Sequence, residues 1–406
     1  MSTNASDLLR TSAEPAVAND PAPEAARALR TAGDGPPAIV PIAPGRAFRE
    51  EIVRRGGGDA ARCFQCATCS SVCDLSTPAA PFPRRQMLWA QWGLSERLLA
   101  DPGIWLCHQC NDCTARCPRD ARPGDALQAL RSLVVERFGA PGFLARLVGR
   151  SGTTWPLLLG APVLFWALFI QAVNGFAVPR TPLVYSDVVP VWMIYSVFLP
   201  AGAFMLLAAF VGARRCWAAW GQGSPRTGSL VSGLVGVVGD VLTHRRFGTC
   251  TAARPRKLGH VLLLWGFLGA LVTTTLLGVA MDIFGVKTPL PQLHPIKLIG
   301  NASAILLVAG SVWLAANRLG DEAATGRSRS FDAFLLVLVL LLVFSGVGAE
   351  LGRLVLPARA ALALYVLHLG MVLSLFLTFP FSKLAHALYR TLAMAHERLA
   401  AERRPS

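Results

Sequence analysis

Eight of the ten cysteines fall into two runs, which are Cys63, Cys66, Cys69 and Cys73, and Cys107, Cys110, Cys113 and Cys117. Thiolates placed every three residues let one tight loop surround an iron–sulfur cube, and the fourth cysteine of such a run ligates the other cube in two-cluster proteins. The two runs therefore predict two [4Fe–4S] clusters that exchange their fourth ligands. The predicted sets are Cys63, Cys66, Cys69 and Cys117 for the first cluster, and Cys107, Cys110, Cys113 and Cys73 for the second.

Structural zinc and disulfide bonds are the alternatives for these cysteines. Zinc sites usually separate two Cys-x-x-Cys pairs, whereas each run here places four cysteines within eleven residues. Disulfides require an oxidising compartment. The second run ends in Cys117-Pro118, as bacterial iron–sulfur runs do, and the first ends in Cys73-Asp74, which leaves the ligand count intact. The pattern therefore favours iron–sulfur clusters.

The rest of the chain is too apolar for an ordinary soluble protein. Of its 406 residues, 53% are hydrophobic and 16% are charged, and the mean hydropathy is +0.46. From Trp155 onward, six stretches are long enough to cross a bilayer, which takes about 20 residues. These stretches run approximately over 155–178, 190–211, 258–284, 296–319, 331–356 and 361–384.

These features predict a mainly α protein, with an α-helical dicluster ferredoxin-like domain followed by a six-helix transmembrane bundle. Residues 1–45 are rich in alanine, proline and small polar side chains, which predicts a disordered tail without an export signal. The two-cluster domain is expected over 46–140, a linker or membrane-surface segment over 141–154, the membrane domain over 155–390, and a cytoplasmic tail over 391–406.

The distribution of lysine and arginine predicts the orientation of the bundle. The loops and tail on one side carry sixteen Lys and Arg residues, whereas the loops on the other side carry four. Because cytoplasmic loops hold the basic excess, both termini are expected on the cytoplasmic side of a bacterial inner membrane. The net charge of +15 then reflects topology, so nucleic acid is not an expected partner. A reducing cytoplasm also suits iron–sulfur ligands better than disulfides.

Histidines in the apolar half are candidate cofactor ligands, because ionisable residues inside membrane spans are costly and usually functional. His368 lies in the sixth span and His386 at its cytoplasmic end, 18 residues further on. On one continuous helix this separation is five turns, so both imidazoles would project from one face, about 27 Å apart. That arrangement suits one axial ligand for each of two haems b stacked across the bilayer.

Two further histidines complete the predicted haem ligands. His260 opens the third span at the depth of His386, and this pair is expected to bind the haem on the cytoplasmic side. His294, just before the fourth span, is the expected partner of His368 for the outer haem. The alternative is that these are polar residues at helix ends with no ligand. The remaining histidines and cysteines of this half are interpreted as solvated side chains or free thiols, and they are His244, His396, Cys216 and Cys250.

Over about residues 60–390 the chain resembles the membrane-bound components of the quinone-interacting membrane-bound oxidoreductases. Those proteins fuse a heterodisulfide reductase C-like ferredoxin domain to a cytochrome b that resembles the nitrate reductase gamma subunit. The two cysteine runs carry the first part of the resemblance. The second part is carried by Leu258-Gly-His260, His294-Pro-Ile-Lys297, His368 and His386. The gamma subunit has a second histidine ten residues along the earlier helix, where this chain has Ala270.

The resemblance implies a membrane anchor that passes electrons between quinone or quinol and cytoplasmic flavin and iron–sulfur subunits similar to heterodisulfide reductase A. In that family the complex serves adenylylsulfate reductase in dissimilatory sulfur metabolism. The chain would contribute electron transfer and a quinone site to an oxidoreductase complex, rather than the chemistry of the terminal substrate. No Gly-rich nucleotide fingerprint with a Rossmann pattern occurs in the sequence, so flavin or NAD is not expected to bind this chain.

Lys297 is the candidate residue for the quinone site, because a quinone needs a hydrogen-bond donor beside a haem and Lys297 lies three residues from His294. The alternative is a lysine that extends to the lipid headgroups. Glu350, near the outer end of the fifth span, is expected either to relay protons or to reach the membrane interface.

Three other functions are alternatives. A related anchor of a sulfite-reductase-linked or nitrate-reductase-like complex would share the membrane half. A catalytic component of heterodisulfide reductase would need paired adjacent cysteines, and this sequence has none. A transporter with an iron–sulfur sensor domain would show inverted repeats, of which the sequence gives no convincing sign.

Overall fold

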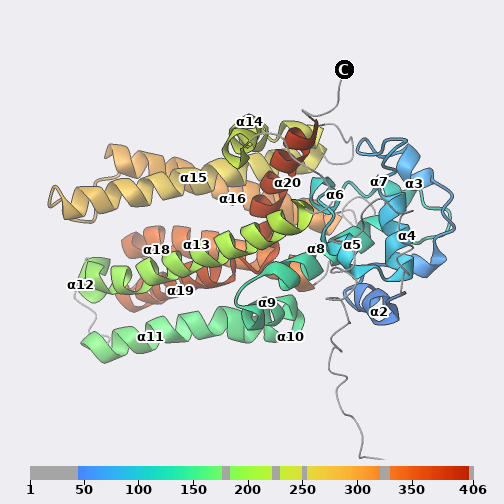
Figure 1. The fold of residues 1–406 in the computed structure, drawn as a ribbon. Helices are drawn as coiled ribbons and strands as arrows, with labels where there is room; N and C mark the ends of the chain where they lie inside the picture. Colours follow the sequence, from blue (N-terminus) through green and yellow to red (C-terminus); the bar gives the residue numbers. More distant parts are fainter. Residues whose placement is uncertain (1–43, 176–182, 222–228, 249–253, 321–329, 402–406) are drawn as a thin grey trace, which may run out of the picture. The chain divides into compact units, whose positions relative to one another are not determined.

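The computed structural model describes residues 44–175, 183–221, 229–248, 254–320 and 330–401. The described elements within Gly45–Ser406 form one compact unit. Every regular element among these described residues is a helix, which confirms the mainly α prediction (Figure 1). The predicted tail, apart from its last two residues, and Cys250 lie outside the described residues.

Six helical segments are long and apolar enough to cross a membrane. The first comprises α10 (Ser151–Trp155), a π-helical turn (Pro156–Gly160) and α11 (Ala161–Asn174), and the others are α13 (Val191–Gly221), α15 (Arg254–Asp282), α16 (Pro295–Gly320), α18 (Ser330–Val355) and α19 (Ala358–Thr378). Large apolar side chains project from them, and Leu207, Phe210 and Ile305 are 63%, 64% and 69% exposed. Such a surface is compatible with a multi-pass membrane protein, in which lipid covers it.

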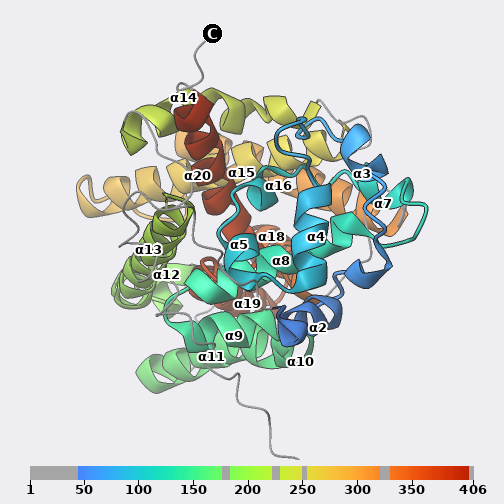
Figure 2. The same ribbon diagram turned by 45° about the vertical axis from the view of Figure 1, so that its right-hand side comes forward.

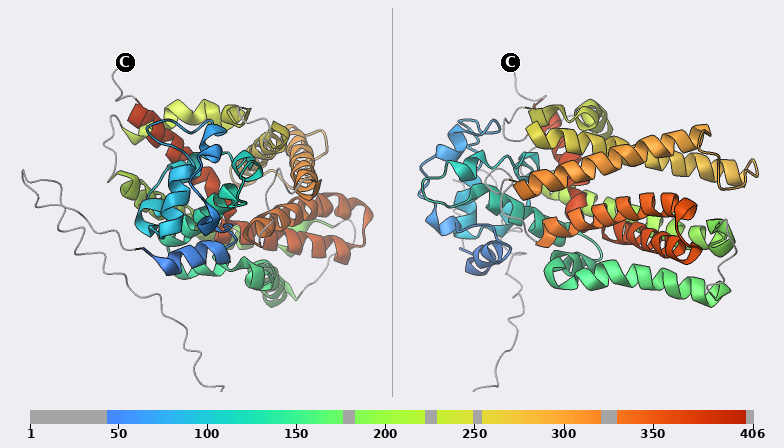
Figure 3. Two further views of the ribbon diagram at one scale, coloured as in Figure 1. Left: turned by 90° about the vertical axis from the view of Figure 1, so that its right-hand side faces the viewer. Right: turned by 180° about the vertical axis from the view of Figure 1, so that it is seen from behind.

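Small residues let these helices approach one another closely. In the hairpin of α15 and α16, a Cβ added at Gly310 would lie only 2.9 Å from the backbone nitrogen of Leu263. In the contact of α19 with α11, a Cβ at Gly370 would collide with Cγ2 of Val163. Figure 3 shows the α15–α16 hairpin and the neighbouring pair of α18 and α19. Close backbone approach is the usual basis of helix association where lipid supplies no hydrophobic driving force.

The sixth span ends earlier than the sequence pattern predicts. α19 ends at Thr378 and Pro380 follows in a turn, because proline lacks the N–H that would continue the helix. His386 then begins a separate helix, α20 (His386–Ala401). The expectation that His368 and His386 project from one face of one continuous helix is therefore wrong.

The segment between the second and third spans contains a helix that the sequence pattern did not predict. One face of α14 (Leu230–Thr243) packs on α20, where a Cβ added at Gly233 would lie 3.1 Å from Leu399 (Figure 2). On its other face Val231 and Val235 are each 68% exposed. Fourteen residues are too few to span a bilayer. The second span also differs from the prediction, since α13 continues to Gly221, well past Val211.

The part of the protein that carries the cysteine runs consists of short helices around an apolar centre. They are α2 (Arg46–Arg54), α3 (Thr68–Ser71), α4 (Arg84–Trp92), α5 (Ser95–Leu99), α6 (Gly103–Leu106), α7 (Asp112–Ala115) and α8 (Pro123–Phe138). Ile52, Met87, Leu98 and Leu130 are almost fully buried among them. Pro123 occupies the first turn of α8, where no intrahelical N–H bond is lost.

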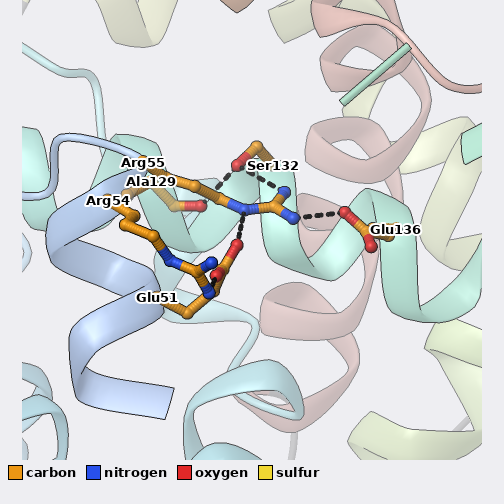
Figure 4. A network of polar contacts seen from close by, with 6 residues as sticks. All are labelled: Glu51, Arg54, Arg55, Ala129, Ser132 and Glu136. Carbon is orange, nitrogen blue, oxygen red and sulfur yellow. Dashed lines mark hydrogen bonds and ion pairs between the residues drawn. The ribbon is translucent and has the colours of Figure 1, made fainter. Parts of the chain in front are cut away.

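An ion-pair network fastens α2 to α8 (Figure 4). Arg55, at the end of α2, places its Nε 2.6 Å from Oε1 of Glu51, and its Nη2 binds Glu136 of α8. Nη1 of Arg55 also donates a hydrogen bond to Oγ of Ser132 at 3.3 Å. Ser132 and Glu136 are four residues apart on α8 and so share one face. The first helix of this part is thereby held to the helix that leads, through α9 (Gly142–Gly149), to the first span.

The cysteine-bearing part meets the membrane half mainly through α6 and α8, which contact α20 and α13 respectively. Trp105 of α6 stacks on Tyr389 of α20, with ring centroids 5.0 Å apart. Both side chains are almost completely buried, together with Val134 and Trp220. The helix that begins at His386 therefore packs directly under the segment that leads into the second cysteine run.

Candidate functional site

The eight cysteines of the two runs surround two separate hollows. One is lined by Cys63, Cys66, Cys69 and Cys117, and the other is lined by Cys73, Cys107, Cys110 and Cys113. These are the two sets that the sequence spacing predicts, with the last cysteine of each run placed beside the other run. The short helices α3 and α7, which follow the two loops, contact each other and bring the loops together.

Both cysteine loops have the same unusual backbone. Gln65 and Ala67 flank Cys66 with φ angles of 57° and 68°, and Gln109 and Asn111 occupy the same positions of the second loop at 54° and 67°. Non-glycine residues in this left-handed region cost of order 1–3 kcal/mol each and occur mainly at functional sites. Alternation of right- and left-handed residues turns successive N–H groups toward one concave space, which suits an anionic group.

The arrangement of the cysteines fits a cluster better than a single ion. Zinc requires four ligands about 2.0–2.3 Å from one point. In the part of the chain that the structure describes, no three His, Cys, Asp or Glu side chains gather closely enough to hold one metal ion. The nine cysteines in that part are all free thiols, which removes disulfide bonds among them. Four sulfurs around a hollow are what a cube of iron and sulfide needs.

Burial makes two thiols of the second hollow, those of Cys73 and Cys113, poor acids. Burial, reinforced by the neighbouring Cys107 and Cys110, raises the pKa of Cys73 to about 12. The same causes raise the pKa of Cys113 well above its ordinary value. Because cysteine binds metal as the thiolate, cluster assembly here would release protons from these thiols. The free energy of the iron–sulfur bonds would have to offset the cost of deprotonation.

The second cysteine loop is bound by arginines of two membrane-half helices. Nη1 of Arg390, on α20, donates to the carbonyl of Cys107 at 3.0 Å, and its Nη2 donates to Nδ1 of His108 at 2.7 Å. Nη2 of Arg256, on α15, donates to the carbonyl of Gln109 at 2.7 Å. Burial, with Arg390 and other nearby arginines, lowers the pKa of His108 to about 3, so its ring is a neutral acceptor. The loop is therefore fixed to the membrane half.

The same two helices carry the first predicted pair of haem ligands. His260 lies four residues after Arg256, and His386 lies four residues before Arg390, so each histidine shares a helix face with its arginine. The two imidazole centroids are 6.5 Å apart. Two imidazoles that ligate one metal ion from opposite sides have centroids about 6 Å apart, counting about 2 Å for each metal–nitrogen bond and about 1 Å from each nitrogen to its ring centre. The spacing therefore fits axial ligation of one iron.

The surroundings of His386 also suit a ligand. Its Nδ1 donates to the carbonyl of Lys383 at 2.6 Å, which leaves Nε2 for a metal. The Lys383 ammonium is itself 2.7 Å from Oδ1 of Asp332 on α18, so this support is anchored to another span. Burial lowers the pKa of His386 to about 4, so the ring is neutral near pH 7, as a metal ligand must be.

Two histidines interpreted as solvated are placed differently by the structure. His244 stacks on His260 with ring centroids 6.0 Å apart, and burial lowers the pKa of His244. His396 is 4% exposed, between Trp217 and Trp220. Both interpretations are therefore wrong. The apolar stretch that forms α14 was the signal in the sequence that could have corrected both interpretations. It shows that the segment predicted to be a basic loop contains a helix, and His244 lies at the end of that helix.

The structure does not bring the second predicted haem pair together. His368 lies in the middle of α19, and its Nδ1 is 3.1 Å from the carbonyl of Leu342 on α18. Gly346 leaves space for it, since a Cβ there would lie 2.8 Å from the imidazole. His294 precedes α16, and its Nδ1 accepts the N–H of Ile296 at 3.3 Å. Among the described residues no ring contact joins His294 to His368, because one lies at a helix end and the other about 15 Å from either end of its helix.

Lys297 belongs to a polar cluster at the opposite end of the bundle from the cysteine loops. Its Nζ is 2.5 Å from Oε1 of Glu350 on α18, and Arg353 approaches the same oxygen at 2.8 Å. Gln292 donates to this oxygen at 3.3 Å. The lysine is thus held by a carboxylate of the neighbouring span.

Two family models match separate parts of the chain, and the second of these parts begins within α11, inside the first span. The family described as Citrate utilization protein B matches residues 169–406, and the 4Fe-4S dicluster domain matches residues 59–121. Citrate utilization protein B of Escherichia coli is 25% identical over 311 residues, which cover 71% of this chain and 79% of that protein.

The similarity to heterodisulfide reductase proteins is confined to the cysteine-bearing part. The C-type component of the H(2):CoB-CoM heterodisulfide,ferredoxin reductase of Methanothermobacter thermautotrophicus is 36% identical over 86 residues, 21% of this chain and 46% of that protein. A heterodisulfide reductase C-like protein of Archaeoglobus profundus is 36% identical over 97 residues, 23% of this chain and 51% of that protein. The chain thus spans about half the length of these two relatives. No solved structure matches the chain.

Proposed function

The chain belongs to the Citrate utilization protein B family, and from this premise we propose that it is a membrane anchor exchanging electrons between quinone and a soluble redox partner. Its 4Fe-4S dicluster domain, similar to heterodisulfide reductase C proteins, marks it as an iron–sulfur electron-transfer subunit. The observation that carries the proposal is the common position of the second cysteine loop and of the His260–His386 pair. Both are held by α15 and α20, through Arg256 and Arg390.

Each cofactor has a set of residues suited to hold it. The two cysteine sets would bind two [4Fe–4S] clusters, and His260 and His386 would supply the axial nitrogens of a haem b. When bound, these groups supply one-electron redox chemistry, which no side chain of this chain provides. The arginines keep the second loop beside the histidine pair, and the close packing of Trp105 on Tyr389 excludes water between them.

The basic residues favour a cytoplasmic position for this end of the bundle. The excess of lysine and arginine lies on the side of the cysteine loops, and cytoplasmic loops carry such an excess. We therefore place the chain in a bacterial cytoplasmic membrane with the iron–sulfur part inside the cell, where thiolates stay reduced.

The family match bears on the identity of the soluble partner. Proteins similar to heterodisulfide reductase A that serve adenylylsulfate reductase remain one proposal, supported by the likeness to heterodisulfide reductase C proteins. A soluble oxidoreductase of citrate utilization is the second, favoured because the Citrate utilization protein B family matches residues 169–406, which contain five of the six spans. Neighbouring genes distinguish them: a heterodisulfide reductase A-like gene supports the first, and a gene for an oxidoreductase of citrate utilization supports the second.

The purified protein is expected to contain two haems b, one on His260 and His386 and one on His368, whose second ligand is not His294 because the structure does not bring these two residues together. A pyridine haemochrome assay, set against iron and protein content, gives the number. A single haem would remove His368 as a haem ligand and leave the first pair intact. Protein with full iron–sulfur content and no absorbance bands of a reduced b-type cytochrome would overturn the proposed route to quinone.

Lys297→Ala is expected to slow haem reduction by quinol about tenfold, with haem content unchanged. Lys297 would donate a hydrogen bond to a quinone oxygen, and a charged hydrogen bond contributes about 1.5–3 kcal/mol. Stopped-flow absorbance after mixing with a short-chain quinol measures the rate. Lys287→Ala, which removes an exposed lysine from the segment before α16, is the control and should react as the native protein does. Native kinetics in the Lys297 variant would remove this residue from the site.

A further inference from the structure

The two cysteine loops repeat the sequence Cys-x-Gln-Cys, and this repeat makes their surroundings directly comparable. The variable position is His108 in the second loop and Phe64 in the first. His108 is 8% exposed and binds Arg390 of α20, so this position fastens its loop to the membrane half. Phe64 is 67% exposed. The same position of the same loop is thus covered by a helix in one run and open to solvent in the other.

We propose that the surface around Phe64 is the docking site for a soluble redox protein that carries an acidic rim around its own cofactor. The inference rests on the proposed electron-transfer function and identifies the surface at which the soluble partner binds, called the port surface below. The port surface is defined by Arg62, Phe64, Cys66 and Arg119.

The first cysteine set lies directly beneath this surface. Cys66 is exposed, whereas Cys107 and Cys113 of the second set are buried. Phe64, Arg119 and Pro118 line the same hollow as the first set. A partner that covers Phe64 would therefore approach a cluster held by this set without any intervening helix. The second loop offers no such approach on the side of His108, because α20 covers it.

The chemistry of the surface resembles that of protein interfaces. The guanidinium of Arg119 lies 4.0 Å from the ring centroid of Phe64. Phenylalanine and arginine are both enriched at protein interfaces, and arginine is also enriched among the residues that dominate binding energy. Fixed in this way, the ring of Phe64 is already ordered before a partner binds, which lowers the entropic cost of association.

The charge of the surface selects an acidic partner. Arg62 and Arg119 are exposed there, and Arg84 lines the hollow. The acidic groups are Asp59 and Asp120, which lie 3.9 Å and 3.8 Å from Arg62, so the basic charge is in excess. Complementary charge steers association and is weakened by salt.

Binding is tested with full-length protein in detergent and reduced flavodoxin, a small acidic flavoprotein, as the probe. Fluorescence anisotropy of labelled flavodoxin gives the dissociation constant, and stopped-flow mixing gives the rate at which one electron leaves the flavin and one cluster gains it. Arg119→Glu should weaken binding at least about tenfold and flatten its salt dependence. Phe64→Ser should weaken binding about tenfold, and Phe64→Tyr should restore most of it.

Arg97→Glu, which reverses an exposed charge on α5, is the matched control and should bind as the native protein does. If Arg97→Glu and Arg119→Glu weaken flavodoxin binding equally, net charge alone controls binding, and the proposed docking site is wrong. Native affinity in the Phe64 and Arg119 variants would overturn it as well. Binding and cluster reduction are measured without quinol. The docking site can therefore be tested even if the haem and quinone proposal proves wrong.

Discussion

The His386→Ala protein is expected to lose one haem and to keep both iron–sulfur clusters. The ring centroids of His386 and His260 are 6.5 Å apart, and the hydrogen bond of Nδ1 leaves Nε2 of His386 for the haem iron. Alanine at this position would remove one of the two ligands. Electron transfer from quinol to the clusters should fall at least about a hundredfold, since even outer-shell partners of metal ligands contribute about 10–100-fold. Haem is measured by absorbance and the clusters by electron paramagnetic resonance.

Two further histidine variants show whether the loss is specific. His396→Ala removes another buried imidazole of α20 and should keep the native haem content. That result would show that the haem loss in His386→Ala comes from the missing ligand and not from misfolding of α20. His244→Ala tests the other ring that packs on His260. If His244→Ala loses the haem and His386→Ala retains it, the ligand pair is His244 and His260, and the assignment of His386 is wrong.

Cys73→Ser is expected to disturb the cluster bound by the second cysteine run, and Cys117→Ser the cluster bound by the first. The reason is the exchange of fourth cysteines, since Cys73 lines the hollow of Cys110 and Cys117 lines the hollow of Cys66. Each replacement removes one of four ligands, so loss or conversion of one cluster signal is the expected size of effect. Electron paramagnetic resonance of the reduced protein separates the two signals.

Reference variants identify the two signals. Cys66→Ser and Cys110→Ser each mark one cluster, and the spectrum of Cys73→Ser should match that of Cys110→Ser. Cys216→Ser changes a thiol buried in α13, outside both hollows, and should leave both signals unchanged. A Cys73→Ser spectrum that instead matches Cys66→Ser would mean that each run binds its own cube.

The sequence was sufficient for the features that depend on local spacing. The cysteine intervals predicted which four sulfurs share each hollow, and apolar length predicted the six spans. The pairing of His260 with His386 was also predicted, although on the assumption of one helix from His368 to His386. That assumption passed over Pro380, whose missing N–H ends α19 and gives α20 its own direction.

Other features depend on contacts between distant segments and were not predicted. His244 looks like a loop residue until α14 forms and sets it against His260. Arg256 and Arg390 were counted only as topology signals, because nothing local shows that their guanidinium groups reach the carbonyls of Gln109 and Cys107. Lys297 likewise meets Glu350 only because α16 packs on α18.

The arginine contacts on the second cysteine loop limit how the soluble half can work. A carrier domain that swings between docking stations must release its contacts in every cycle, and its turnover then slows in viscous or crowded surroundings. Here Arg256 and Arg390 hold the loop from two helices, and Trp105 is packed on Tyr389. The iron–sulfur half is therefore held at one position relative to the membrane half, and under the proposed function the soluble partner is the component that must bind and dissociate in each cycle.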